Sequence, residues 1–120
     1  MDTLSVPISE AMAAKLRALP PEEQRGVTES LQELAEEAIK MREHPEIYFR
    51  DGAAGRRARV RGGFDVWIMI QPYYLNGKDW EILRQTYDWL PEPVLRAALR
   101  YYESYPDEIE DWIIRNNRVD

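Results

Sequence analysis

The chain has 120 residues, 44% of them hydrophobic, and a net charge of −6. This is enough apolar material to pack one ordinary domain or two small ones, which excludes a disordered chain, and the lack of cysteine excludes disulfides, thiolate zinc sites and a thiol nucleophile. No apolar run typical of a signal peptide opens the sequence, and the longest apolar stretch, residues 66–70, is too short to span a bilayer. We therefore expect a cytoplasmic protein with no membrane partner.

The N-terminal part predicts a strand followed by two helices. Residues 1–8, MDTLSVPI, alternate between apolar and other side chains, which indicates a short strand. Ser9 suits the N-cap of a helix over residues 10–19, which a pair of prolines ends. Thr28 is expected to cap a second helix, whose apolar stripe runs to about Met41.

A strand this short and two helices with an uncovered apolar stripe cannot bury their apolar faces alone, so we expect residues 1–43 to form a homodimer or a higher oligomer. The segments TLSVPIS and GVTESLQELAEEAI resemble the ribbon-helix-helix repressors. In that family the paired strands lie in the major groove of DNA. The resemblance implies base contacts from Thr3 and Ser5 and phosphate contacts from Thr28 and Ser30.

Residues 44–120 form a second predicted domain. The alternating runs EIYFR and RRARVRG flank DGAAG, which predicts a β-hairpin. Helices are expected at about 65–75, 80–87 and 93–105, with Asp79 as the cap of the second, and Pro106 opens a fourth. The predicted fold class is therefore mainly α: a strand-helix-helix segment, a small hairpin, and three helices with an extra C-terminal helix.

The order of GRRARVRGGFDVW, a glycine turn and LPEPVLRAALRYYESYPDEI resembles the domain-of-unknown-function 433 family of predicted antitoxins, over about residues 44–118. The family's G-x-R-x-x-V stretch falls on residues 55–60, and the pattern of its third helix falls on residues 94–101. The resemblance implies a trihelical, homeodomain-like core. It also implies the antitoxin role in a toxin–antitoxin pair, with a PIN-like nuclease toxin as partner.

Basic residues are concentrated in one place, because residues 50–63 carry five arginines and a single acid. Strand alternation puts Arg57, Arg59 and Arg61 on one face, and Arg56 lies beside them. Such a ribbon could follow a phosphate backbone, which makes operator DNA an expected partner. Two alternatives remain open: the arginines bridge to acidic helices of the same chain or of a dimer mate, or they contact the toxin.

The last helix is the expected toxin-binding surface. Four carboxylates between residues 107 and 111 are favoured by the helix dipole in the first turn, or they block a nuclease site that normally grips metal and phosphate. Aromatic anchors at an edge favour a protein partner. The expected toxin contacts are Tyr102, Tyr105, Ile109, Trp112, Ile113 and Arg115. Three other tryptophans, Trp67, Trp80 and Trp89, are expected in the core.

Catalytic signals are missing from the sequence. The only histidine, His44, precedes a proline at a helix end, and no metalloprotease, P-loop or nucleophile-elbow pattern occurs. We therefore predict no enzyme activity, no catalytic residue, no cofactor and no metal site. The predicted function is an antitoxin that neutralises a PIN-like nuclease and represses its own operon. The alternative is a DNA-binding transcriptional regulator with no toxin.

Overall fold

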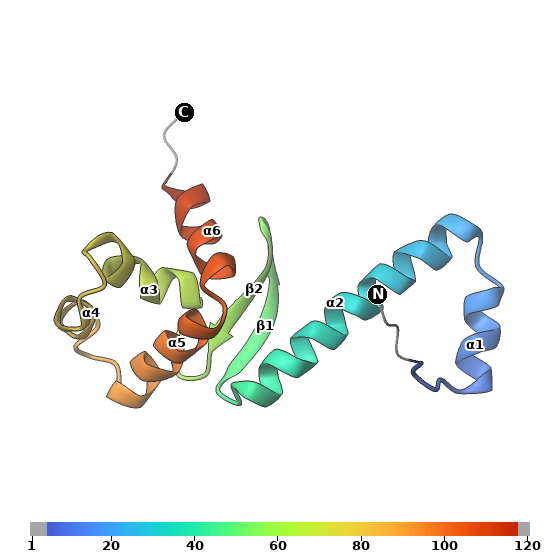
Figure 1. Ribbon diagram of the computed structural model, residues 1–120, viewed down its shortest axis with the longest axis horizontal. Coiled ribbons are helices and arrows are strands. Elements are labelled where there is room, and N and C mark those ends of the chain that lie inside the picture. Colours follow the sequence, from blue (N-terminus) through green and yellow to red (C-terminus); the bar gives the residue numbers. More distant parts are fainter. Residues whose placement is uncertain (1–4, 118–120) are drawn as a thin grey trace. The chain divides into compact units, whose positions relative to one another are not determined.

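The computed structural model describes residues 5–117, which form six helices and one β-hairpin (Figure 1). The elements are α1 (Glu10–Arg17), α2 (Pro21–Glu43), β1 (Ile47–Gly52), β2 (Gly55–Val60), α3 (Val66–Leu75), α4 (Trp80–Thr86), α5 (Glu92–Ser104) and α6 (Pro106–Asn116). The chain divides into two compact units, Met1–Glu37 and Ala38–Asp120. The predicted class, mainly α with a small hairpin, is confirmed.

The helices of the first unit begin at residues whose backbone chemistry suits a helix start. The Ser9 hydroxyl accepts a hydrogen bond from the Met12 amide at 3.1 Å, which confirms Ser9 as the cap of α1. The prediction that Thr28 caps the second helix is wrong, because α2 already begins at Pro21, and proline is favoured at the first helical position. Thr28 lies inside α2, where its hydroxyl donates to the Gln24 carbonyl at 2.9 Å.

The described part of the predicted N-terminal strand, residues 5–8, does not form a strand. Residues 5–9 form no strand and no helix, and residues 1–4, which include Thr3, lie outside the described residues. A strand exists only when a second strand satisfies its backbone groups. The predicted partner was the same segment of another chain, so the single chain gives Ser5 to Ile8 nothing to pair with.

The hairpin of the second unit forms as predicted. The two strands pair antiparallel, with Ile47 opposite Val60 and Arg50 opposite Arg57. Gly55 adopts a φ of 126° at the turn, a backbone conformation that glycine reaches without strain. Ile47 and Val60 point into the core of the unit, so the alternate positions, which carry Arg50, Arg57 and Arg59, lie on the opposite face.

Four helices complete the core, and α3 and α5 are its central pair because each contacts the other three helices and β2. Their bounds agree with the predicted ranges to within about a residue, and Asp79 caps α4 by accepting from the Glu81 amide at 2.9 Å. The fully buried side chains include Val60, Val66, Met69, Ile70, Leu83, Ala98, Tyr101, Ile109 and Ile113. Among residues 5–117, no helix is long and apolar enough to cross a membrane.

The last turns of α2 belong to this second unit because polar side chains tie them to α5 and α6. The Lys40 ammonium pairs with a Glu108 carboxylate oxygen at 2.6 Å, and the Tyr105 hydroxyl donates to Glu43. His44, just after α2, lies 3.1 Å from the Ser104 hydroxyl through its Nε2 atom. These contacts explain why the compact unit begins before the end of the helix.

Candidate protein-binding and nucleic-acid-binding sites

Two arginines of the hairpin form ion pairs with one buried carboxylate. Asp65, which is only 5% exposed, lies at the start of α3, and its backbone forms an isolated antiparallel β-bridge with Arg59 of β2. Its two oxygens lie 2.7 Å from Nε of Arg57 and 3.4 Å from Nε of Arg59. The structure therefore favours the intramolecular alternative for these two arginines, although the acid is Asp65 and not one of the expected acidic helices. DNA contact by Arg57 and Arg59 stays a prediction.

The other two arginines of the predicted DNA-binding set also have neighbours within the chain. A guanidinium nitrogen of Arg56 lies 3.1 Å from Asp51 in an exposed pair, and the Arg61 guanidinium stands 5.4 Å from the centre of the Tyr48 ring. Exposed pairs of this kind contribute at most about 1 kcal/mol and can exchange partners. Arg61, whose neighbour is an aromatic ring, would therefore cost less to redirect to a phosphate than Arg57 and Arg59, which lie against the buried Asp65 carboxylate.

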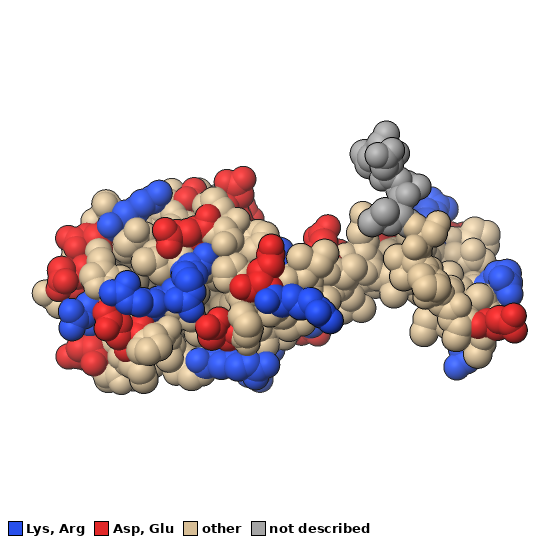
Figure 2. Space-filling model, turned by 60° about the horizontal axis from the view of Figure 1, so that its bottom comes forward, with Lys and Arg blue, Asp and Glu red and all other residues tan. Residues whose placement is uncertain are grey.

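Acidic and basic side chains alternate over the visible surface of the second unit (Figure 2). Arg96 pairs with Glu92 at 2.9 Å, and Arg100 pairs with Glu46 at 3.1 Å. A nucleic-acid-binding face normally presents a continuous basic stripe. No such stripe forms where these pairs mix the two signs.

The remaining predicted DNA contacts lie in the other unit. Thr28 and Ser30 are both on α2. The Thr28 hydroxyl donates to a helix carbonyl, and Ser30 lines an apolar groove. Ser5 lies in the irregular segment before α1. They belong to the first compact unit, whereas the hairpin arginines belong to the second.

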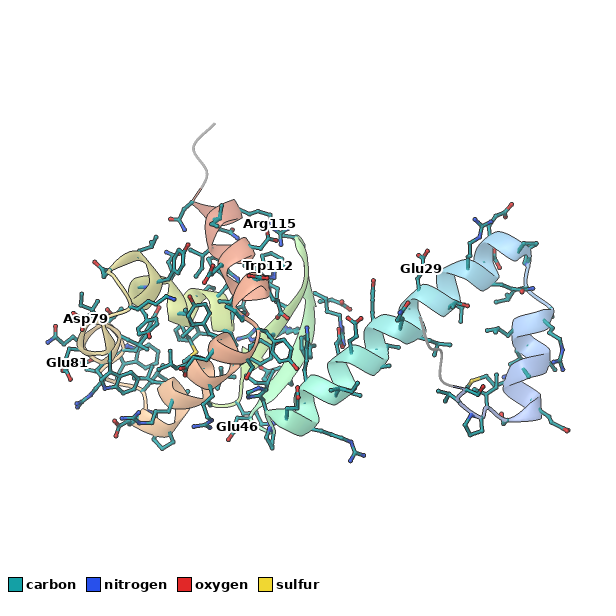
Figure 3. All side chains as sticks on the ribbon, viewed as in Figure 1. Glu29, Glu46, Asp79, Glu81, Trp112 and Arg115 are labelled. Atoms are coloured by element: carbon teal, nitrogen blue, oxygen red, sulfur yellow. The ribbon has the colours of Figure 1, made fainter. Side chains whose placement is uncertain are left out.

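The structure gives the predicted toxin-binding surface little support, because four of its six side chains are buried, and toxin contact at this surface stays a prediction. Tyr102, Ile109, Trp112 and Ile113 are each 9% exposed or less, so they hold α5 and α6 in the core and present no edge to a partner. Arg115 is exposed, with its guanidinium 4.3 Å from the centre of the Trp112 ring (Figure 3). The apolar stripe of α6 gave the correct spacing but could not say which face of the helix is covered.

The acidic run of α6 is used inside the unit. Glu108 accepts from the Tyr101 hydroxyl at 2.8 and 2.9 Å, and Glu110 accepts from the Tyr102 hydroxyl at 2.6 Å. Burial, and next the hydrogen bond to Glu110, raise the pKa of Tyr102 well above its ordinary value. Asp111 forms an ion pair with Arg115 at 3.0 Å. These contacts favour the structural explanation of the run over the blocking of a nuclease.

One tryptophan was placed wrongly. Trp67 and Trp80 pack against the core as predicted, but Trp89 is 67% exposed. Its ring stacks on Phe64 with centroids 6.2 Å apart and meets Tyr87 edge-on at 6.3 Å. Trp89 lies in the connection after α4, where helical spacing carries no information about burial.

An apolar groove in the first unit is the surface that the sequence did not localise. Its volume is about 580 Å³, and it is lined by Leu19, Glu23, Gly26, Val27, Ser30, Leu31 and Leu34. Neither α1 nor α2 contains a buried residue, and Leu31 and Leu34 remain 47% and 53% exposed. We call this surface the α2 groove.

The floor of the α2 groove is open. A Cβ atom built on Gly26 would meet nothing within 4 Å, so the helix has room for a side chain from elsewhere at this point. Glu29 projects from the side of α2 that faces away from α1 (Figure 3). The signal that could have located the groove is the repeat of apolar residues at 27, 31, 34 and 38, whose average spacing of about 3.7 residues is close to the 3.6-residue turn of an amphipathic helix.

Within the part of the chain that the structure describes, no group of three His, Asp or Glu side chains could hold a metal ion. The arrangement offers instead an apolar groove, an exposed tryptophan and a compact scaffold. These features suit binding to another macromolecule.

Comparison with known proteins gives one structural neighbour. No family model matches the sequence, and no curated protein matches it. The chain is similar to the crystal structure of a DUF433 member protein from Anabaena variabilis, with 26% identity, 88% of this chain and 98% of that chain covered, and a TM-score of 0.45. The family in that description is the one whose motifs residues 44–118 resemble.

Proposed function

We propose that this protein works by binding another protein through the α2 groove, as the antitoxin half of a toxin–antitoxin pair. The α2 groove carries the proposal. Covering a leucine fully is worth about 1.5–3 kcal/mol, so covering the exposed half of Leu31 and of Leu34 would contribute roughly 1 kcal/mol each. A helix pair that leaves such side chains in water is expected to have a partner.

The second unit supports this proposal as a scaffold. Carboxylates and tyrosines of this unit satisfy one another, and most of its aromatic side chains pack in or against its own core. The binding surface proposed here is therefore the first unit and not α6, where the sequence placed it. The motifs of residues 44–118 that resemble predicted antitoxins support the choice of partner, a PIN-like nuclease toxin.

Operator binding and dimerisation through residues 1–43 remain predictions of the sequence. The ion pairs of Asp65 give hairpin-mediated DNA binding less support than the arginine count alone suggested. The alternative of a regulator without a toxin has no specific feature of the described residues in its favour.

Co-expression with the product of the adjacent gene tests the proposal. We expect the tagged chain to retain that product and to relieve its toxicity. Changing Leu31→Ala together with Leu34→Ala should weaken the complex about 30-fold, because roughly 2 kcal/mol of apolar contact is lost. Ile39→Ala is the matched control: this side chain is 57% exposed on another face of the same helix, and its loss should change the affinity little. If the wild-type chain retains nothing, the antitoxin proposal is wrong.

A further inference from the structure

The border that α2 gives to the α2 groove is acidic. Glu23 lies in its wall, and Glu33 follows Ser30, another wall residue, by three positions and so neighbours it on the helix surface. Between residues 22 and 37 α2 carries six glutamates and one basic residue, Arg25. At about 100° per residue, Arg25 lies roughly 160° around the helix from Val27, which lines the groove. The helix therefore brings no positive charge to the groove.

Resting on the proposed function, we infer that the α2 groove binds an amphipathic segment of a partner protein in which lysine or arginine flanks the apolar side chains. The apolar positions would cover Leu31 and Leu34, and the cations would meet Glu23 and Glu33. Opposite charges across an interface steer association and select the partner, whereas like charges oppose it.

This chemistry disfavours a second copy of the chain as the occupant. Two α2 grooves that faced each other would bring their acidic borders together, and the described residues of the first unit, 5–37, hold seven glutamates against three basic residues. A cationic segment instead removes repulsion while it covers the leucines. A nuclease that binds a phosphate backbone would offer such a segment, because it must itself be basic at its substrate site.

Two synthetic helical peptides with the same leucine face test the inference on the full chain, one with lysine and one with glutamate on the polar face. We expect the lysine peptide to bind at least tenfold more tightly than the glutamate peptide in fluorescence anisotropy. Its affinity should fall as salt rises. Equal binding of the two peptides, or binding of neither, overturns the inference.

Charge variants of α2 provide the second arm. Glu23→Gln with Glu33→Gln should weaken the lysine peptide about tenfold. The control, Glu10→Gln with Glu36→Gln, removes the same charge from two positions that have no groove-lining residue three or four positions away on their helices, and should change binding less than threefold. Equal losses in the two double variants would assign the attraction to net charge alone and overturn a site at the groove.

Filling the groove gives a third readout. Gly26→Leu should block the lysine peptide, whereas Gly26→Ala should not, since a Cβ at this position has open space around it. Circular dichroism of both variants shows whether the fold is retained. Peptide binding that survives Gly26→Leu places the site elsewhere and overturns the inference.

The two proposals fail in different ways. The inference is wrong, and the antitoxin proposal is unaffected, if two results occur together. The neighbouring gene product is retained equally well after Glu23→Gln with Glu33→Gln, and the chain shows no preference between the two peptides. Specific binding of the lysine peptide with no retention of the gene product does the reverse. Sedimentation of the free chain gives a further outcome: a dimer that Leu31→Ala dissociates would make a second copy the occupant.

Discussion

Replacing Asp65 with asparagine removes the one carboxylate that Arg57 and Arg59 share. The Asp65 side chain is 7% exposed and the two arginine side chains are 22% and 21% exposed, so the substitution leaves two neighbouring guanidinium groups partly buried with no counter-charge. Breaking a buried ion pair by removing one partner costs about 3–5 kcal/mol. We expect about 3 kcal/mol, because neither Nε atom makes a well-directed hydrogen bond to the carboxylate and both arginines keep some contact with water.

Thermal and urea unfolding followed by circular dichroism measure this loss. For a domain of the size of the second unit, about 3 kcal/mol corresponds to a fall of roughly 12–24 °C in Tm. Adding Arg57→Gln to the variant should restore part of the stability, because it removes one of the uncompensated charges. Asp51→Asn is the control: its exposed pair with Arg56 should contribute less than about 1 kcal/mol. A loss of less than about 1 kcal/mol in the free energy of unfolding for Asp65→Asn would refute the structural role of the Asp65 ion pairs. Arg57 and Arg59 would then again be candidates for binding phosphate.

Three further predictions concern packing and protonation. Gly63→Ala should destabilise the second unit, because a Cβ there would meet side-chain atoms at 3.0 Å. Gly26→Ala should instead stabilise α2 by about 0.5–1 kcal/mol, because its Cβ has open space and alanine favours a helix. Urea unfolding in which both variants change the free energy of unfolding in the same direction would contradict this. Ile113→Ala should cost about 2–5 kcal/mol in the same measurement, since this side chain is buried, and a loss below 1 kcal/mol would show that α6 is not part of the core. The hydrogen bond to Glu43, and next burial, raise the pKa of Tyr105 from 10.0 to about 12, so the folded state holds this proton more tightly than the unfolded state does. The contribution of this hydroxyl to stability is present below pH 10 and is lost as the pH rises toward 12. Glu43→Gln should therefore move the late phase of the tyrosine titration, followed by absorbance at 295 nm, toward pH 10. An unchanged titration would mean that the hydrogen bond to Glu43 does not raise this pKa.

Much of the second unit could be predicted because its signals are local. Turn residues flank the hairpin, Asp79 caps α4, and Pro106 opens α6, so each boundary depends on residues within a few positions of it. The errors fall where a boundary or a strand has no such local determinant. Thr28 has the side chain of a helix cap, but Pro21 starts the helix earlier, and the segment around Ser5 needs a second strand that one chain does not supply.

The candidate sites were harder to predict, because a site depends on which face of an element is covered. The spacing of Ile109, Trp112 and Ile113 identified an apolar stripe, and the same stripe is required for a core and for a docking surface. The spacing of Leu31 and Leu34 is of the same kind, yet these side chains remain half in water. Periodicity does not separate the two cases.

The helical content, the hairpin, most element boundaries and the concentration of positive charge at residues 50–63 could be predicted, since they follow from neighbouring residues and from composition. Two features depend on packing in three dimensions: the carboxylate of Asp65 lies within reach of Arg57 and Arg59, and α6 is covered while the α2 groove is open. The physical reason is that burial and charge neutralisation are properties of side chains brought together in space from separate elements. The chain order fixes which side chains are available, and the packing fixes which of them still face water.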